Sequence, residues 1–539
     1  MPATPTVAHS PPAHEPRRAA LTALLACIGV FASYLPIGGV AVSLPTIQQG
    51  LSASTSDLQW ISDAFILPMA ALILTFGLIG DLYGRKKAYL VGLLLFAAGS
   101  LTSLTASSPQ QIWVGQALSG AGAAALLTST LALISHVYPD FRARAKAISA
   151  WAAALGLGMS LGPLVSGLVL EHANWRWIFL PGLVVAVLAT AIGALLLEDS
   201  RSAHGRAIDI PGQVIAVVTI TALVYGVIEG GESGWSSTRA VIAFVVAAVG
   251  LVGFVVTERK VASPMLSMSL FRSRAFTGAG VVIALTLFAQ VGLVFSLSLF
   301  FGTVQHLSAL QIGWRFLALN GITVLLGPVA GKLMGRVAPG LLLTIGLLVT
   351  GLGTLWLNTL DAHSSGGTVT PILLVIGTGL SFVMAPITAV AVGSVPHHLA
   401  GMASAGSNTL RQVGGAMGPA VFGVILTNHT VSSLPSTLAQ SGLSTTDQHQ
   451  VTAAVAREGL SAAGHLGLPA PATGQALGAF GESFSSALHM CTTIGAIGMF
   501  VAAVVSSVLI GVRRHKDQAP TPVDPDTTGR HRRQEQARV

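Results

Sequence analysis

Gly80-Asp81-Leu82-Tyr83-Gly84-Arg85-Lys86-Lys87 separates two long apolar runs and is rich in charge. The two glycines let neighbouring helix ends turn and approach closely. The three basic side chains need water or lipid headgroups, and Asp81 can pair with one of them. The stretch therefore predicts a short cytoplasmic loop between two membrane helices, in an all-α integral membrane protein.

The composition agrees with a bilayer as the main solvent. Of 539 residues, 52% are hydrophobic and 9% are charged, whereas soluble domains carry about 25% charged residues. The net charge of +8 comes from short basic clusters between apolar runs, which indicates membrane topology and not a nucleic-acid partner. Cys27 and Cys491 lie in apolar runs, so we expect neither a disulfide framework nor a metal site.

The apolar runs give the helix count. A spanning helix needs about 20 apolar residues, and the sequence holds fourteen such runs in a pattern of six, two and six. They lie near residues 20–44, 59–79, 87–106, 111–136, 145–169, 176–197, 211–229, 239–257, 276–301, 315–335, 340–358, 370–393, 405–427 and 487–512.

The basic residues support this count. With a cytoplasmic N-terminus, nearly all Lys and Arg fall on the inner side, as cytoplasmic loops require. The exceptions are Arg176, Arg239, Arg315 and Arg457. We therefore expect a multi-pass protein of the plasma membrane with both termini cytoplasmic.

Five segments follow from these runs. They are a cytoplasmic N-terminal segment (1–19), a six-helix bundle (20–198), two inserted helices (199–258), a second six-helix bundle (259–512) and a disordered basic tail (513–539). The second bundle includes a long outer loop, 428–486, rich in Ser, Thr, Ala and Gly. We interpret it as a solvated loop with a short helix between Val451 and Leu460; a lid or partner contact is the alternative.

Two motifs occur twice. Gly80–Arg85 (GDLYGR) is repeated as Gly331–Arg336 (GKLMGR), and Gly162–Gly167 (GPLVSG) as Gly418–Gly423 (GPAVFG), at nearly the same separation. The last six helices thus repeat the first six. Matching halves with a cavity between them near the bilayer midplane are typical of secondary transporters.

These residues resemble the fourteen-helix drug:proton antiporter family of the major facilitator superfamily, over roughly residues 20–512. The resemblance rests on Gly80–Lys87, Gly158–Gly167 (GMSLGPLVSG, with Ser166 where a second glycine is usual), Trp175–Phe179, Arg411–Ala416 and Trp60–Phe65. It implies a proton-coupled multidrug or antibiotic exporter that moves small hydrophobic or amphipathic compounds outward by alternating access.

Two positions depart from the family pattern. Its acid in the first helix and its arginine in the fourth, both implicated in proton coupling, are Pro36 and Gln116 here. Asp63 is the only acid well inside an apolar run, where a charged aspartate costs about 2.5–3.5 kcal/mol. We therefore expect Asp63 to be the proton-coupling residue; a carboxyl wetted in an outer vestibule is the alternative.

The resemblance also assigns a gate. A state-dependent latch between inner helix ends would consist of Gly80, Asp81, Gly84 and Arg85. Only the first bundle has this latch in full, because Lys332 occupies the position of Asp81 in the second bundle. Arg411, at or just inside the cytoplasmic end of the thirteenth helix, is expected to take part in gating. A snorkelling arginine without a transport role is the alternative.

Further candidates lie inside the helices. The fifth helix is expected to have a flat packing face and a kink, formed by Gly158, Gly162, Pro163 and Gly167. The resemblance links this face to antiport. Four amides are candidate cavity residues that contact substrate or simply tie helices together: Gln116, Gln290, Asn320 and Asn408.

The predicted function is export driven by an ion gradient. No catalytic or phosphate-binding motif is present, so we expect neither an enzyme nor a cofactor. The expected partners are a small amphipathic substrate, protons and the lipid bilayer, and we expect a monomer. An importer or facilitator of the same fold, and a non-transporting scaffold or sensor, remain the alternatives.

Overall fold

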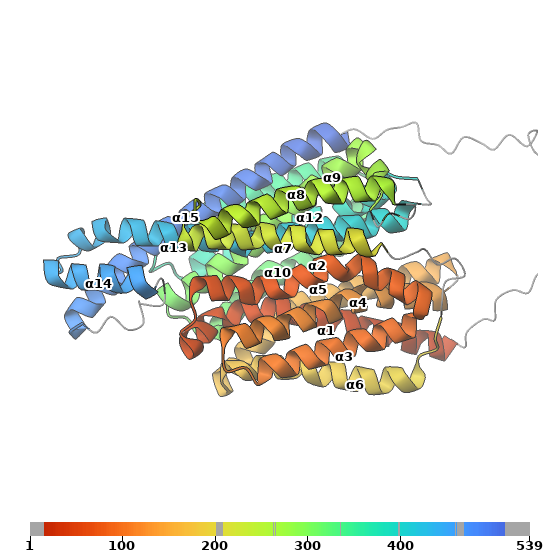
Figure 1. The fold of residues 1–539 in the computed structure, drawn as a ribbon, viewed down its shortest axis with the longest axis horizontal. Helices are drawn as coiled ribbons and strands as arrows, with labels where there is room; N and C mark the ends of the chain where they lie inside the picture. Colours follow the sequence, from red (N-terminus) through yellow and green to blue (C-terminus); the bar gives the residue numbers. More distant parts are fainter. Residues whose placement is uncertain are drawn as a thin grey trace, which may run out of the picture.

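The computed structural model describes residues 16–511 except 139, 201–208, 262–263, 265, 335, 397–398, 459 and 461–467. Every regular element in these ranges is a helix, and the helices lie alongside one another in an elongated body with α14 at one tip (Figure 1). The predicted tail 513–539 and most of the segment 1–19 lie outside the described residues.

Six helices cover the first six apolar runs. They are α1 (Pro16–Leu51), α2 (Thr55–Tyr83), α3 (Arg85–Leu104), α4 (Pro109–Val137), α5 (Phe141–His172) and α6 (Leu180–Leu196), the last preceded by the 3-10 helix η1 (Trp175–Phe179). α2 starts with a capping box, in which Ser54 and Asp57 each accept a hydrogen bond from the other's backbone N–H. Only Gly84 separates α2 from α3, and its φ of 120° disfavours any residue with a side chain.

The remaining runs form the inserted pair and the second set. The inserted helices are α7 (Ile210–Ser233) and α8 (Thr238–Lys260). The second set comprises α9 (Arg274–Leu299) with the π-helix η3 (Phe300–Val304), α10 (Ala309–Met334), α11 (Pro339–Trp356), α12 (Gly366–Gly393), α13 (Ala400–Gln440) and α15 (Ala470–Val505).

Length and hydropathy support most of these helices as spans. Within the described ranges, twelve helices can cross a membrane, or thirteen if α2 counts despite a 50° bend between Thr55–Ile73 and Thr75–Tyr83. Of the fourteen helices that cover the predicted apolar runs, α13 is the one outside this set, and its 41 residues extend well beyond its run. The all-α membrane fold is confirmed, and the count of fourteen spans stays a prediction.

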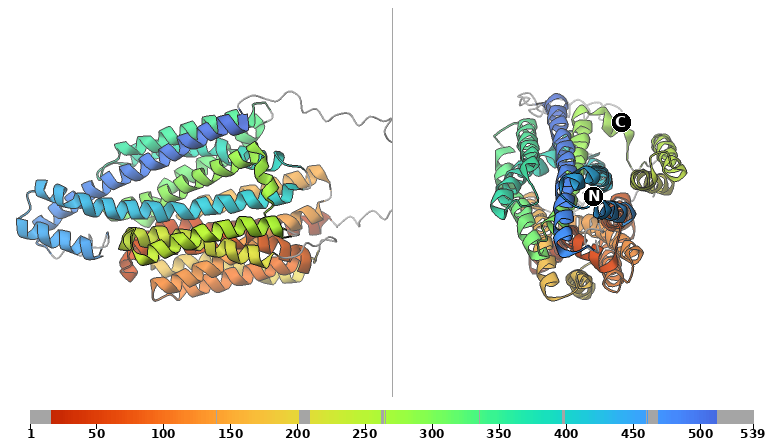
Figure 2. Two further views of the ribbon diagram at one scale, coloured as in Figure 1. Left: turned by 45° about the horizontal axis from the view of Figure 1, so that its top comes forward. Right: turned by 90° about the vertical axis from the view of Figure 1, so that its left-hand side faces the viewer.

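The two sets of helices pack in the same way. In the first set, α1 packs against α5, and both α2 and α3 pack against α4. In the second set, the equivalent helices do the same: α9 packs against α13, and both α10 and α11 pack against α12. Between the sets, α2 packs against α13 and α5 against α10, so these two interfaces are also equivalent. This is the pseudo-twofold pair of six-helix bundles that the repeated motifs indicate, with α7 and α8 beside them (Figure 2).

The segment 428–486 differs from the predicted loop because most of it is helical. α13 continues to Gln440, α14 spans Thr445–Glu458, and α15 begins at Ala470. Its buried apolar residues join the main core, and they include Leu434, Leu438, Val451, Val455 and Phe480. The short helix expected between Val451 and Leu460 overlaps α14. The rest of the segment was expected to be a solvated loop, because a composition rich in small and polar residues hid these apolar positions at helical spacing.

Candidate functional site

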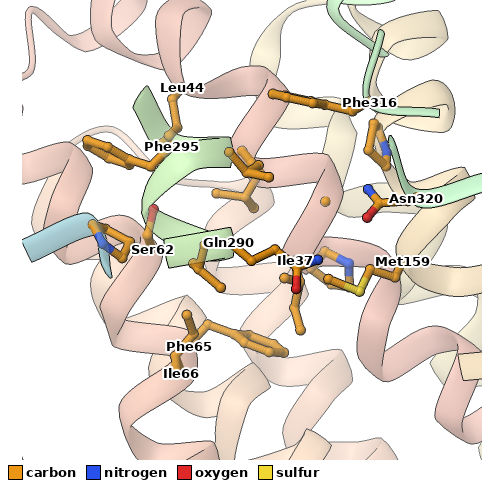
Figure 3. A pocket seen from close by; sticks show the side chains of 18 of the residues that line it. Ile37, Leu44, Ser62, Phe65, Ile66, Met159, Gln290, Phe295, Phe316 and Asn320 are labelled. Carbon is orange, nitrogen blue, oxygen red and sulfur yellow. The ribbon is translucent and has the colours of Figure 1, made fainter. Parts of the chain in front are cut away.

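A cavity of about 50 Å³ lies between the two bundles, and α1, α2, α4, α5, α9, α10 and α13 contribute to its wall (Figure 3). Phe65, Phe295 and Phe316 give it aromatic faces, and Ile37 and Met159 add apolar ones. Pockets for drug-sized ligands measure about 300–1,000 Å³. In this structure the cavity is therefore too small for such a ligand.

Four polar side chains reach this cavity: Ser62, Gln116, Gln290 and Asn320. Gln116 Nε2 donates to the Ile61 carbonyl oxygen at 3.4 Å. Within the described part of the chain, Gln290 and Asn320 have no hydrogen-bond partner, so their amides can meet a ligand. Both bundles thus supply polar groups to one apolar space.

Asn408, the fourth predicted amide, does not join them. Its Nδ2 donates to the Ser404 carbonyl oxygen of its own helix at 3.2 Å, and it is not among the residues that line the cavity. Three of the four amides are thus brought together.

Asp63 is fully buried, and neither carboxylate oxygen has a hydrogen-bond partner among the described residues. It follows Gln59 by one helical turn, so the two side chains share a face of α2. Gln59 Nε2 donates to the carbonyl oxygens of Pro419 and Ala420 in α13, at 3.2 and 3.0 Å. Asp63 therefore lies at the α2–α13 contact and not on the cavity wall, and this burial does not fit a wetted vestibule carboxyl.

Arg411 is deeper than the sequence indicated. It lies eleven residues after Ala400, where α13 begins, which is about 16 Å along a helix that rises 1.5 Å per residue. Its Nη2 donates to Thr388 Oγ1 of α12 at 3.0 Å, whereas its Nε is buried without a partner in the described structure. α13 starts before its apolar run, so Arg411 lies farther from the helix end than the sequence indicated, and its part in gating stays a prediction.

The neighbours of Arg411 connect the two bundles. Tyr34 of α1 lies near both Arg411 and Gln412, and Gln412 Nε2 lies 3.2 Å from Met69 Sδ of α2. Nothing in the sequence around Tyr34 or Thr388 marks either residue as a partner of an arginine far along the chain.

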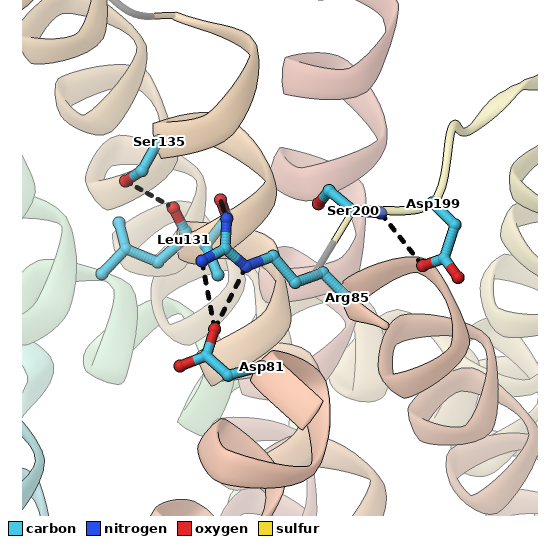
Figure 4. A network of polar contacts seen from close by, with 7 residues as sticks. Asp81, Arg85, Leu131, Ser135, Asp199 and Ser200 are labelled. Atoms are coloured by element: carbon cyan, nitrogen blue, oxygen red, sulfur yellow. Dashed lines mark hydrogen bonds and ion pairs between the residues drawn. The ribbon is translucent and has the colours of Figure 1, made fainter. Parts of the chain in front are cut away.

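Asp81 and Arg85 form an ion pair across the break between α2 and α3 (Figure 4). Arg85 Nη2 lies 3.0 Å from Asp81 Oδ1, and its Nη1 donates to the Ala132 carbonyl oxygen of α4 at 3.4 Å. The same guanidinium therefore ties together the ends of three helices.

The segment after α6 packs against this loop. The Arg85 backbone N–H donates to the Ser200 carbonyl oxygen at 2.9 Å, and Lys86 Nζ donates to the Leu197 carbonyl oxygen at 2.7 Å. A Cβ added at Gly84 would lie only 2.4 Å from Asp199 Oδ1, so glycine is required there. Nothing in the sequence points to Asp199, whose carboxylate occupies the space that a side chain at position 84 would need.

The repeated loop of the second bundle is looser. Lys332 and Arg336 are exposed, and a Cβ added at Gly331 would meet nothing within 4 Å. Within the described ranges, neither basic residue forms an ion pair. The two repeats are therefore unequal in structure as well as in sequence.

The glycines of α5 allow close backbone contact. A Cβ at Gly158 would lie 2.6 Å from the Phe31 carbonyl oxygen of α1, and one at Gly162 would lie 2.3 Å from that of Leu35. A Cβ at Gly167 would lie 2.7 Å from Cα of Leu310 in α10. Pro163 lines the cavity. Gly158 and Gly162 thus face α1 of their own bundle and Gly167 faces α10 of the other, so the expected single flat face is divided between two contacts.

Residues 26–419 match the family model described as Major Facilitator Superfamily. The chain belongs to this superfamily. Over 406 residues it is 33% identical to "Multidrug resistance protein Stp" of Mycobacterium tuberculosis (strain CDC 1551 / Oshkosh), covering 75% of each chain. It is 29% identical over 535 residues to the "Tetracenomycin C resistance and export protein" of Streptomyces glaucescens, covering 97% of this chain and 98% of the relative.

Solved structures agree on the major facilitator fold. A bacterial homologue of the human lysosomal transporter Spinster, in an inward-facing and unoccupied conformation, aligns with a TM-score of 0.63 at 14% identity. The alignment covers 93% of this chain and 100% of that one. At this identity the likeness concerns the fold alone.

Proposed function

We propose that this protein is a proton-coupled exporter of small hydrophobic or amphipathic compounds, including antibiotics, and that it works by alternating access. The observation that carries the proposal is the apolar cavity with amide groups from both bundles. Relatives named for multidrug resistance and for resistance and export support outward movement of such compounds. We further propose a monomer in the plasma membrane with both termini cytoplasmic.

Alternating access needs a contact that opens, and α1 and α9 offer one toward the α14 end. Ser298 Oγ donates to the Ala41 carbonyl oxygen, and a Cβ added at Gly302 would lie 2.3 Å from Pro45 Cγ. This contact closes one side of the cavity, so a substrate can leave there only when α1 and α9 separate.

Asp63 is our candidate for the proton. In the closed α2–α13 contact a charged carboxylate would have no partner, which is costly in an apolar interior. Movement of the bundles would bring water to this contact and allow the carboxyl to release its proton. Proton binding and the position of the bundles can therefore influence each other.

Inverted membrane vesicles test this function. With an acidic lumen, we expect a fluorescent hydrophobic probe to accumulate in vesicles that contain the protein, and to accumulate far less once an ionophore removes the gradient. An unchanged flux would overturn proton coupling. Gradient-driven movement in the opposite direction would favour an importer, and no flux above empty vesicles would favour a scaffold or sensor.

A further inference from the structure

The cavity carries no formal charge. Among the described residues that line it, the polar side chains are one hydroxyl and three amides, and the others are apolar. The two ionisable groups discussed above lie elsewhere: Asp63 is in the α2–α13 contact, and Arg411 is hydrogen-bonded to Thr388. A ligand in this space therefore meets only neutral partners.

A smaller space of about 10 Å³ extends the cavity into the first bundle. The two share Pro36, Val40 and Gln116, and the smaller one is lined by the hydroxyl residues Ser100, Ser119 and Ser166. These three serines are buried, and no hydrogen bond occupies their hydroxyls in the described structure. A space of this size with several polar partners suits one water molecule. The polar extension of the cavity is thus also uncharged.

This lining sets which molecules can bind. A cation that leaves water needs a carboxylate to replace its hydration. The cavity offers neutral amides, a hydroxyl and phenylalanine rings, and a π face contributes only about 0.5–2 kcal/mol, much less than the hydration that an ion loses. Amides both donate and accept hydrogen bonds, so they suit carbonyl and hydroxyl groups.

We infer that the cavity takes uncharged aromatic molecules that carry carbonyl or hydroxyl groups and excludes permanently cationic ones. The inference rests on the proposed export function and deepens it.

The absence of charge on the substrate has an energetic consequence. Exchange of an uncharged molecule for a proton moves one positive charge inward per proton, so the membrane potential drives export as well as the pH gradient. At equilibrium, each proton exchanged gives about tenfold accumulation for every 60 mV.

The experiment uses the full-length protein in liposomes with its cytoplasmic face outward. The probes are a dihydroxyanthraquinone and its trimethylammoniomethyl derivative, and empty liposomes correct for passive partition. With no pH gradient and a lumen-positive potential, we expect the neutral probe to accumulate about tenfold per 60 mV. We expect no transport of the cationic derivative under any gradient.

Three outcomes overturn the inference. Equal transport of the cationic derivative would show that charge is accepted. Accumulation of the neutral probe that follows the pH gradient but ignores the potential would exclude exchange of an uncharged molecule for protons. In both cases the exporter itself would stand. If neither probe moves under any gradient, the proposed function fails and the inference fails with it.

Variants of the lining give a second measurement. Gln290→Glu places a carboxylate in the cavity and is expected to admit the cationic derivative. Asn320→Leu removes a hydrogen-bonding group and should raise the KM of the neutral probe about three- to tenfold. Asn408→Leu is the matched control, because Asn408 bonds within its own helix. Equal effects of the two leucine variants, or continued exclusion of the cation by a folded Gln290→Glu protein, would contradict the inference.

Discussion

Asp63 is a buried carboxyl without partners in the described structure, placed where the two bundles touch. We predict that Asp63→Asn abolishes accumulation driven by a pH gradient but preserves downhill movement of the substrate. Asparagine keeps the volume of the side chain and cannot release a proton. The measurement is uphill and downhill flux in the same vesicles.

The matched control is Asp57→Asn, in the first turn of the same helix. Asp57 caps α2 through the Ser54 backbone N–H, and the amide oxygen of asparagine can still accept that hydrogen bond. Full coupling in the Asp63→Asn protein would refute the assignment to this residue without refuting proton coupling.

The Asp81–Arg85 pair leads to a prediction about rate. The two side chains are 42% and 20% exposed, and pairs of this kind contribute about 0.2–1 kcal/mol. If the pair holds one state of the cycle, its loss shifts the equilibrium between states roughly 1.5- to 5-fold. Asp81→Asn should therefore lower the initial transport rate by about this factor, measured at equal protein content.

Lys332→Asn is the control for this prediction. Lys332 occupies the position of Asp81 in the repeat, is exposed, and forms no ion pair within the described ranges. Its substitution should leave the rate nearly unchanged. The same loss of rate in both variants would contradict a latch confined to the first bundle.

Individual residues were only partly predictable. The sequence identified Gln116, Gln290 and Asn320 as candidates, and all three line the cavity. It could not separate them from Asn408, because hydropathy does not fix the rotation of a helix when lipid and protein interior are equally apolar. Tyr34 and Thr388 were missed because their proximity to Arg411 arises only from tertiary packing.

At the scale of elements, the α1–α5 contact depends on backbone approach at Gly162. A Cβ there would lie 2.3 Å from the Leu35 carbonyl oxygen, which belongs to a helix backbone and cannot easily move. We predict that Gly162→Ala destabilises the protein by about 1–3 kcal/mol, as overpacking does. Thermal unfolding of the purified protein in detergent measures this change.

Gly498→Ala serves as the control. Gly498 lies inside α15, and an added Cβ would meet nothing within 4 Å. The substitution should be neutral or stabilise the helix by up to about 1 kcal/mol, because alanine favours helices more than glycine does. Equal destabilisation by the two substitutions would argue against close packing at Gly162.

The helices themselves were predictable, whereas some of their ends were not. The positions of the helices can be predicted because a span must be apolar along its length and cytoplasmic loops are enriched in Lys and Arg. Outside the bilayer this demand ends, so the continuation of α13 to Gln440 and the start of α15 at Ala470 escaped detection. Their stability there comes from buried residues such as Leu438 and Phe480.

For the whole molecule, alternating access predicts that a bond between α1 and α9 stops transport. We propose Pro45→Cys with Gly302→Cys, in a protein whose Cys27 and Cys491 are replaced by alanine. A Cβ at Gly302 would lie 2.4 Å from Pro45 Cβ, and a disulfide needs about 3.8 Å, so a small shift allows the bond. Oxidation should abolish transport, and a reductant should restore it.

Each single-cysteine variant should transport normally with and without oxidant. Full activity of a protein shown by mass spectrometry to be cross-linked would contradict the proposal that α1 and α9 separate during the cycle.

The position of α7 makes the two sides of the molecule unequal. α7 packs against both α2 and α13 and so covers the contact between them; Gln213 of α7 bonds to Thr75 in α2, and Gly231 lies against Val424 in α13. At the equivalent α5–α10 contact, the helix that packs against both partners is α1, which lines the cavity. A compound dissolved in the membrane therefore meets α7 before it can reach the α2–α13 contact, whereas the α5–α10 contact has no inserted helix of the α7–α8 pair packed against it in the described structure.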